Sequence, residues 1–404
     1  MAKPEIEPAT SRPTILSRLE GLPIIAVFLV LLIVFMVLAP EVFLSPNIYT
    51  TFLSTLPPLM LLAIGLTFVI GAGEIDLSFP SIIAFSGFLF AVTMKEGSAW
   101  FIGLLTFLHD SGLSFITVAP DADFTNWFGW IGVVLALLGG LLVGYVNGVL
   151  VARVGIPSFI ATLATQFFWA GLATVLSGGK SYALRGASDT SVWQWLVGRP
   201  LAGFDGPFWT TQLPLQALWT AIIVVFLWFI MNRHRFGEHI LFLGDSNDVS
   251  RVVGINVEKE KIRLFTLMGG LAALAAIFLT LENKNFFGNQ GQGYLLLAIA
   301  SVLIGGTSIF GGRATIVGTV FGCLVVMIVE PGLVATGSTG AWVLTIRGLI
   351  FLIAIVFYLY VDEPARRQAM FARLRQRLEF GRGKPAGKEL TGRVAGRDNK
   401  GEGT

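Results

Sequence analysis

About ten apolar runs, most of them close to the length of a membrane-spanning helix, fill this chain of 404 residues. A hydrocarbon core of about 30 Å needs roughly 20 helical residues to cross it. Only 13% of the residues are charged, against about a quarter in an ordinary soluble domain. The sequence therefore predicts an all-α polytopic membrane protein with about ten transmembrane helices, expected at residues 22–39, 52–71, 79–94, 128–151, 158–176, 213–231, 262–281, 294–306, 314–329 and 341–361.

Basic residues at the two ends of the chain predict its orientation. Lys3, Arg12 and Arg18 precede the first apolar run, and residues 364–404 contain eleven Lys or Arg against four Asp or Glu. Because basic residues mark the cytoplasmic side of a membrane protein, both termini are expected to be cytoplasmic. The chain then divides into a cytoplasmic N-terminal segment, a transmembrane domain and a basic cytoplasmic tail, at residues 1–21, 22–361 and 362–404.

Two polar segments are expected outside the membrane. Residues 95–126 carry four acidic residues against one lysine, and their Trp100–Leu108 piece, too short to cross, is expected to lie at the interface. Residues 177–212 are rich in glycine and contain three tryptophans, an aromatic signature of the outer membrane surface.

The chain contains a weak internal echo. Residues 61–87 and 295–322 share apolar helices interrupted by Gly-rich turns. Transporter folds are often built from two related halves. We therefore interpret the echo as two weakly related halves, and chance similarity of Gly-rich apolar helices is the alternative.

A polar island between the sixth and seventh apolar runs, residues 236–263, is flanked by basic residues on both sides. It contains helix-cap candidates, an apolar face and a glycine stop: Asp245, Ser246 and Asn247; Val249, Val252 and Val253; and Gly254. These features predict a short cytoplasmic helix to which a partner binds. The simpler alternative is a loop whose basic residues only set the orientation.

Glu74 and Asp76 interrupt some forty otherwise apolar residues in the stretch GEIDLS. A carboxylate at bilayer depth costs roughly 2.5 to 3.5 kcal/mol on insertion scales, so a compensating environment is expected. One interpretation is a break between two helices that line a pathway, with Ser78 capping the second helix. The other is a cytoplasmic turn in which water solvates both acids.

Several other residues in the apolar runs have two interpretations. Gly140, Gly144 and Gly148 repeat every four residues, which favours close helix packing or a dimer contact. Asn147 is expected to bond to a neighbouring helix or to lie beside the pathway. Three polar residues of the fifth run could contact a hydroxylated solute or bond to another helix: Thr162, Thr165 and Gln166.

Residues for catalysis, metal binding or nucleotide binding do not form a recognisable set. The stretch TVLSGGKS mimics the end of a phosphate-binding loop, but Thr174 stands where that pattern needs glycine. His109, His234 and His239 are scattered, and Cys323 is the single cysteine. The sequence therefore predicts no enzyme activity, bound metal or cofactor within this chain.

Three stretches, GAGEIDLSFPSIIAFSG, GYVNGVLVARVGIPSFIATLAT and IGGTSIFGGRATIVGTVFG, resemble the permease subunits of bacterial ATP-binding-cassette (ABC) importers for ribose, xylose, arabinose and related simple sugars. They occur in this order, and the resemblance covers almost all of the chain. It implies a multi-pass inner-membrane subunit, a cytoplasmic ATPase that carries ATP and Mg, a periplasmic sugar-binding protein and a second permease subunit, identical or different. It also implies that the island is the segment that docks on the ATPase.

We therefore predict a sugar permease moved by a separate ATPase. Coupling to the ATPase is assigned to residues of the island: Gly244, Asp245, Asn247, Asp248, Arg251, Val252 and Gly254. The translocation path is assigned to polar residues of the apolar runs: Glu74, Asp76, Asn147, Thr162, Gln166 and Thr307. The alternative is an ion-coupled secondary transporter of a small polar solute that takes up protons at Glu74 and Asp76.

Overall fold

The protein is helical throughout almost all of its described length. A computed structural model describes residues 22–111, 122–200 and 211–337, and also residues 340, 342, 345, 346, 348, 349 and 352. All of these belong to the first of two units, Met1–Tyr358. The fold class predicted from the sequence, an all-α polytopic membrane protein, is confirmed.

Seven helices of the described part are long and apolar enough to cross a membrane. They are α3 (Pro46–Gly71), α4 (Phe79–Asp110), α5 (Thr125–Ala152), α6 (Ser158–Ser177), α9 (Leu215–Arg233), α12 (Val257–Glu282) and α14 (Ile316–Ala335). Each coincides with one of the ten expected runs, and a further expected run, residues 341–361, lies almost entirely outside the described residues.

Two expected spans are shorter helices in the structure: α1 (Leu22–Leu38) and α13 (Tyr294–Ile304). At a rise of 1.5 Å per residue, the 11 residues of α13 reach only about 16 Å, roughly half of the hydrocarbon core. The expected eighth span is therefore a half-length helix followed by a turn, because Gly305 and Gly306 end it early.

Shorter elements connect the spans. They are α2 (Pro40–Phe43), η2 (Ala187–Asp189), α7 (Ser191–Leu196), α10 (Arg235–Asp245), α11 (Asn247–Val252), and the two-residue strands β1 (Tyr182–Ala183) and β2 (Asn285–Phe286). The strands pair antiparallel, with Tyr182 opposite Phe286. This pairing joins the two segments that follow α6 and α12, the fifth and seventh expected spans, which run in the same direction if each expected span crosses the membrane once.

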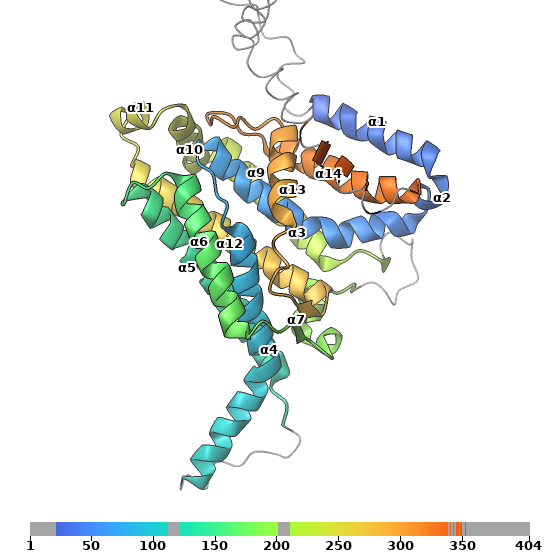
Figure 1. Ribbon diagram of the computed structural model, residues 1–404, viewed down its shortest axis with the longest axis vertical. Helices are drawn as coiled ribbons and strands as arrows, with labels where there is room; N and C mark the ends of the chain where they lie inside the picture. Colours follow the sequence, from blue (N-terminus) through green and yellow to red (C-terminus); the bar gives the residue numbers. More distant parts are fainter. Residues whose placement is uncertain are drawn as a thin grey trace, which may run out of the picture. The chain divides into compact units, whose positions relative to one another are not determined.

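The piece at residues 100–108, expected at the membrane interface, is not a separate segment. In the structure it is the last part of α4, one continuous helix of 32 residues (Figure 1). The charged residues Lys95 and Glu96 do not interrupt the helix, because a charged side chain leaves the backbone hydrogen bonds of a helix intact. Trp100 and Phe107 in this part of α4 are exposed.

Glycines let α5 pack backbone to backbone on α12. A Cβ atom at Gly140, Gly144 or Gly148 would clash with the backbone of α12 at Gly269, Phe265 or Ile262, respectively. Small residues allow this close approach between membrane helices. The three glycines therefore serve packing within this chain, and they place the start of α12 beside the end of α5.

Candidate functional site

The polar island folds into two short helices, α10 and α11, before α12 begins at Val257 (Figure 1). The side chain of Ser246 accepts a hydrogen bond from the N–H of Val249, and Gly254 has a φ of +86° that ends the segment. The predicted cap and stop are therefore confirmed. Helix α10 was not predicted from the sequence, although Ile240 and Leu243 give it a buried apolar face.

The outer surface of α11 is apolar with a charged pair beside it. Val249, Val252 and Val253 are 56%, 86% and 59% exposed. Asp248 and Arg251 form an exposed ion pair with an N–O distance of 3.7 Å. Two exposed valines on this six-residue helix and a third directly after it form the kind of surface that another protein covers.

The inner side of α10 meets two other segments at a glycine junction, formed by Gly71, Gly73, Gly244, Gly311 and Gly312. A Cβ atom at Gly244 would clash with the carbonyl of Gly71 and the N–H of Gly312. The N–H of Gly312 donates to the carbonyl of Gly71 at 3.0 Å. The junction therefore brings the end of α10 into backbone contact with two turns: the one between α3 and α4 and the one between α13 and α14.

The first of these turns, residues 72–78 between α3 and α4, is held by a row of side chains on α6. The N–H groups of Ile75, Leu77 and Ser81 donate to side-chain oxygens of α6 at 2.9–3.0 Å. The acceptors, each four residues from the next, are Ser158, Thr162 and Gln166. Residues at this spacing share one face of a helix. Helix α6 therefore pairs the N–H groups of Ile75 and Leu77 and gives a second acceptor to the N–H of Ser81, which also donates to the carbonyl of Ser78.

Asp76 is buried in a hydrogen-bond network with Ser78 and Asn147. One of its carboxylate oxygens accepts from the N–H and the hydroxyl of Ser78, at 2.7 and 2.6 Å. The Ser78 hydroxyl accepts in turn from the side-chain amide of Asn147 at 2.7 Å. Burial raises the pKa of Asp76, which lies between two spans, and the bonds from Ser78 oppose this effect.

The prediction that the side chain of Ser78 caps the N-terminus of α4 is wrong. Ser78 stands at the N-cap position of α4, but its side chain makes no cap bond. Its hydroxyl donates to the Asp76 carboxylate instead, because bonds to a charged acceptor are roughly twice as strong as bonds between neutral groups.

Glu74 has a different environment from Asp76. Its carboxylate pairs with the ammonium of Lys261 on α12 at 2.5 Å, and both side chains are nearly buried. Hydrogen bonds thus offset the burial of Asp76, whereas an opposite charge offsets that of Glu74. The sequence analysis did not identify Lys261 as the partner, because the two residues lie far apart in the chain.

The second turn, residues 305–315 between α13 and α14, contains Thr307. The hydroxyl oxygen of buried Thr307 accepts from the N–H of Thr315 at 3.3 Å and closes the turn. The hydroxyls of Thr67 on α3 and Thr319 on α14 lie 2.8 Å apart. Each stretch of the internal echo thus folds as helix, turn and helix, and these two helix–turn–helix stretches contact each other.

The structure brings five of the six expected path residues together around the first turn: Glu74, Asp76, Asn147, Thr162 and Gln166. Asp76, Asn147, Thr162 and Thr307 have no exposed surface in the chain. Their described hydrogen bonds fix the broken helices in place. The geometry accounts for these residues as supports of the turns, and a path along them stays a prediction.

Comparison with known proteins identifies relatives along most of the chain. Residues 48–355 match the family described as branched-chain amino acid transport system / permease component. The ribose import permeases RbsC of Escherichia coli and Bacillus subtilis are 29% and 30% identical over 81% and 83% of this chain, and over 90% and 91% of their own length. The fructose import permease FrcC of Rhizobium meliloti is 28% identical over 70% of this chain and 80% of its own length. No solved structure matches the chain significantly.

Proposed function

The chain belongs to the family of branched-chain amino acid transport system permease components, and from this premise we propose that it is the membrane subunit of an ABC importer for a simple sugar. Membership of this family and seven candidate spans make it a multi-pass transport protein of the cytoplasmic membrane. The family description names amino acids, whereas relatives that cover 70% or more of the chain are named for ribose and fructose. The relatives therefore favour a pentose or hexose as cargo.

The proposed assembly contains this chain, a second permease subunit, a cytoplasmic ATPase and a periplasmic sugar-binding protein. ATP and Mg belong to the ATPase. In the proposed topology the chain crosses the membrane ten times, counting α1, α13 and residues 341–361, and both termini lie in the cytoplasm. The basic residues around α10 and α11 then face the ATPase.

The glycine junction supports the part of the proposal that concerns coupling to the ATPase. We assign the exposed residues of α11, with Asp248, Arg251 and Val252 at their centre, to the contact with the ATPase. Asp245, Asn247 and Gly254 set the position of α11 between α10 and α12. Because Gly244 lies in backbone contact with both turns, a displacement of α10 by the ATPase must move at least one of them.

The path is proposed to run beside the two turns. Glu74, Asp76, Asn147, Thr162, Gln166 and Thr307 lie at or next to these turns. A shift of either turn would change which of their polar groups face the sugar. Such a driven change needs contacts that differ between the two states, and we propose that the bonds between α6 and residues 75–81 are the contacts that change.

The test is sugar uptake into vesicles that contain the complete transporter with either Val252→Asp or Val154→Asp. Val154 is a matched control, because it is an exposed valine in the turn between α5 and α6 and outside α11. A charge at the centre of an apolar contact should reduce ATPase co-purification and ATP-driven uptake of ribose or fructose by about tenfold or more. Val154→Asp should leave both near the unmodified level.

Two results would contradict the proposal. Normal ATP-driven uptake with Val252→Asp would exclude α11 as the contact. Uptake driven by an ion gradient without any ATPase would indicate a secondary transporter instead.

A further inference from the structure

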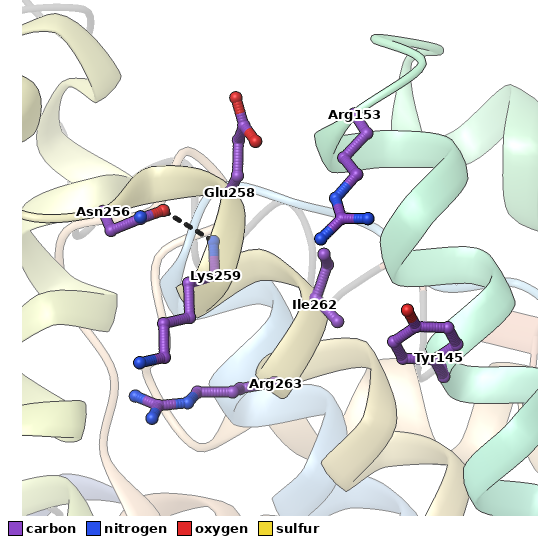
Figure 2. A pocket seen from close by; sticks show the side chains of 7 residues that line it. All are labelled: Tyr145, Arg153, Asn256, Glu258, Lys259, Ile262 and Arg263. Atoms are coloured by element: carbon purple, nitrogen blue, oxygen red, sulfur yellow. Dashed lines mark hydrogen bonds between the residues drawn. The ribbon is translucent and has the colours of Figure 1, made fainter.

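A pocket outside the proposed coupling contact lies between the end of α5 and the start of α12 (Figure 2). Its volume is about 470 Å³. Tyr145 and Arg153 line it on the side of α5, and Lys259, Ile262 and Arg263 line it on the side of α12. Neither the coupling contact nor the two turns account for a pocket at this position.

Positive charge dominates the pocket. Arg153, Lys259 and Arg263 contribute three cations, against the single acid Glu258, which points away from Lys259 and Arg263 in Figure 2. Arg263 also bonds to Glu260 at 3.2 and 3.3 Å. No ion pair is described for Arg153 or Lys259 within the residues that the structure covers.

Two of the cations are forced close together. Lys259 and Arg263 are four residues apart on α12, so their side chains occupy neighbouring positions on one face. Like charges at this spacing repel each other; the bonds from Arg263 to Glu260 offset part of this repulsion, whereas no ion pair is described for Lys259. The ligand expected from this arrangement is a phosphate-bearing anion, which Arg and Lys side chains bind with charge-assisted hydrogen bonds.

The surroundings of the pocket favour a lipid over a soluble anion. Leu138 and Leu142 are 56% and 53% exposed, seven and three residues before Tyr145, and therefore share its face of α5. Tyr145 itself is half exposed beside the cations, which is the usual place of tyrosine at a membrane surface. The basic pocket therefore continues directly into an apolar surface that can hold acyl chains.

We propose that this pocket binds the phosphate headgroup of an anionic phospholipid, with an acyl chain along Leu138 and Leu142 of α5. Basic pockets between membrane helices bind such headgroups. In the proposed orientation the lipid belongs to the cytoplasmic leaflet. The bound lipid would link α5 to the first turns of α12, which follow α11 after four residues and carry Lys261, the partner of Glu74.

The test measures lipid retention by native mass spectrometry on the full-length chain purified in a neutral detergent. The probes are phosphatidylglycerol and, as the uncharged comparison, phosphatidylcholine. The site variant is Arg153→Gln with Lys259→Gln, which leaves the bonded Arg263 in place. The control variant is Arg233→Gln with Arg235→Gln, which removes two exposed cations near the end of α9 and the start of α10.

The expected result is preferential retention of phosphatidylglycerol that falls about tenfold in the site variant and stays near the unmodified level in the control. Leu142→Gln, which leaves all the cations in place, should also reduce retention because it interrupts the apolar surface. Gel filtration of each variant separates a loss of binding from a loss of fold.

Three outcomes would overturn the proposal. Equal losses in the two double variants would mean that the whole basic surface attracts the lipid. Equal retention of the two phospholipids would exclude recognition of the charged headgroup. Displacement of phosphatidylglycerol by excess inorganic phosphate or glycerol phosphate would identify a soluble anion as the ligand. None of these results depends on sugar transport, so the test stands apart from that of the proposed function.

Discussion

At the scale of single residues, this protein places two carboxylates beside its first helix break and stabilises them in different ways. Asp76 relies on bonds from Ser78, whereas Glu74 relies on the charge of Lys261. Removing one partner of a buried ion pair lowers the free energy of unfolding by about 3–5 kcal/mol, because it leaves a buried charge without a counter-charge. Glu74 is therefore the residue that ties the break to α12.

The residue with the sharpest steric requirement is Gly244, and we predict that Gly244→Ala destabilises the protein. The added Cβ would clash with the backbone of Gly71 and Gly312, and overpacking of this kind costs about 1–3 kcal/mol. The measurement is the thermal melting midpoint of the purified chain.

Gly171→Ala is the matched control for Gly244→Ala, because a Cβ at this position of α6 meets no atom within 4 Å. It should leave the midpoint unchanged or raise it slightly, since alanine favours a helix over glycine by about 0.5–1 kcal/mol. Equal midpoints for the two variants would show that the glycine junction tolerates a side chain.

At the scale of elements, α6 acts as a hydrogen-bonding template for an unwound segment. Its acceptors lie one turn apart and bond to N–H groups of residues 75, 77 and 81. A backbone N–H that is shielded from water needs a protein partner. A broken helix is therefore stable here only while α6 lies beside it.

Thr162→Val tests this template, because it keeps the shape of the side chain and removes the acceptor of the Leu77 N–H. We expect it to cost about 1–3 kcal/mol, the penalty for a buried donor without a partner, and to lower the melting midpoint. Thr174→Val is the control on the same helix, since Thr174 is exposed and the only described bond of its hydroxyl is to the carbonyl of Ala170. A similar midpoint for both variants would refute the role of α6.

At the scale of the whole molecule, helices α10 and α11 and the paired strands lie in segments that the proposed topology assigns to opposite sides of the membrane. Residues 234–256 follow the inward-running α9, whereas β1 and β2 follow the outward-running α6 and α12. The antiparallel pairing of β1 with β2 agrees with this assignment, because strands on opposite sides of a bilayer could not pair.

Cysteine labelling tests this topology, and the chain suits it because its single cysteine, Cys323, is buried. In a Cys323→Ser background, Lys180→Cys should react with a membrane-impermeant maleimide in intact cells. Val252→Cys, at an 86% exposed position of α11, should react only after the membrane is permeabilised. The reverse pattern would invert the proposed orientation and remove α11 from the cytoplasm.

The sequence alone determined the features that depend on neighbours in the chain. Apolar runs of span length predicted the membrane helices. Three cap candidates, Asp245, Ser246 and Asn247, predicted the start of α11, and Gly254 predicted its stop. It did not predict the continuity of α4 through Lys95 and Glu96. The two charges suggested that the helix ends there, but charged side chains do not break the backbone hydrogen bonds of a helix.

Only the tertiary structure decided which distant groups meet. The pairing of Glu74 with Lys261, the bonds from residues 75–81 to α6 and the contact of Gly244 with two separate turns all join parts of the chain far apart in sequence. A local pattern shows that a buried charge or an unpaired N–H needs a partner. The packing of glycine-bearing helices decides which partner comes within bonding distance, and this depends on the whole fold.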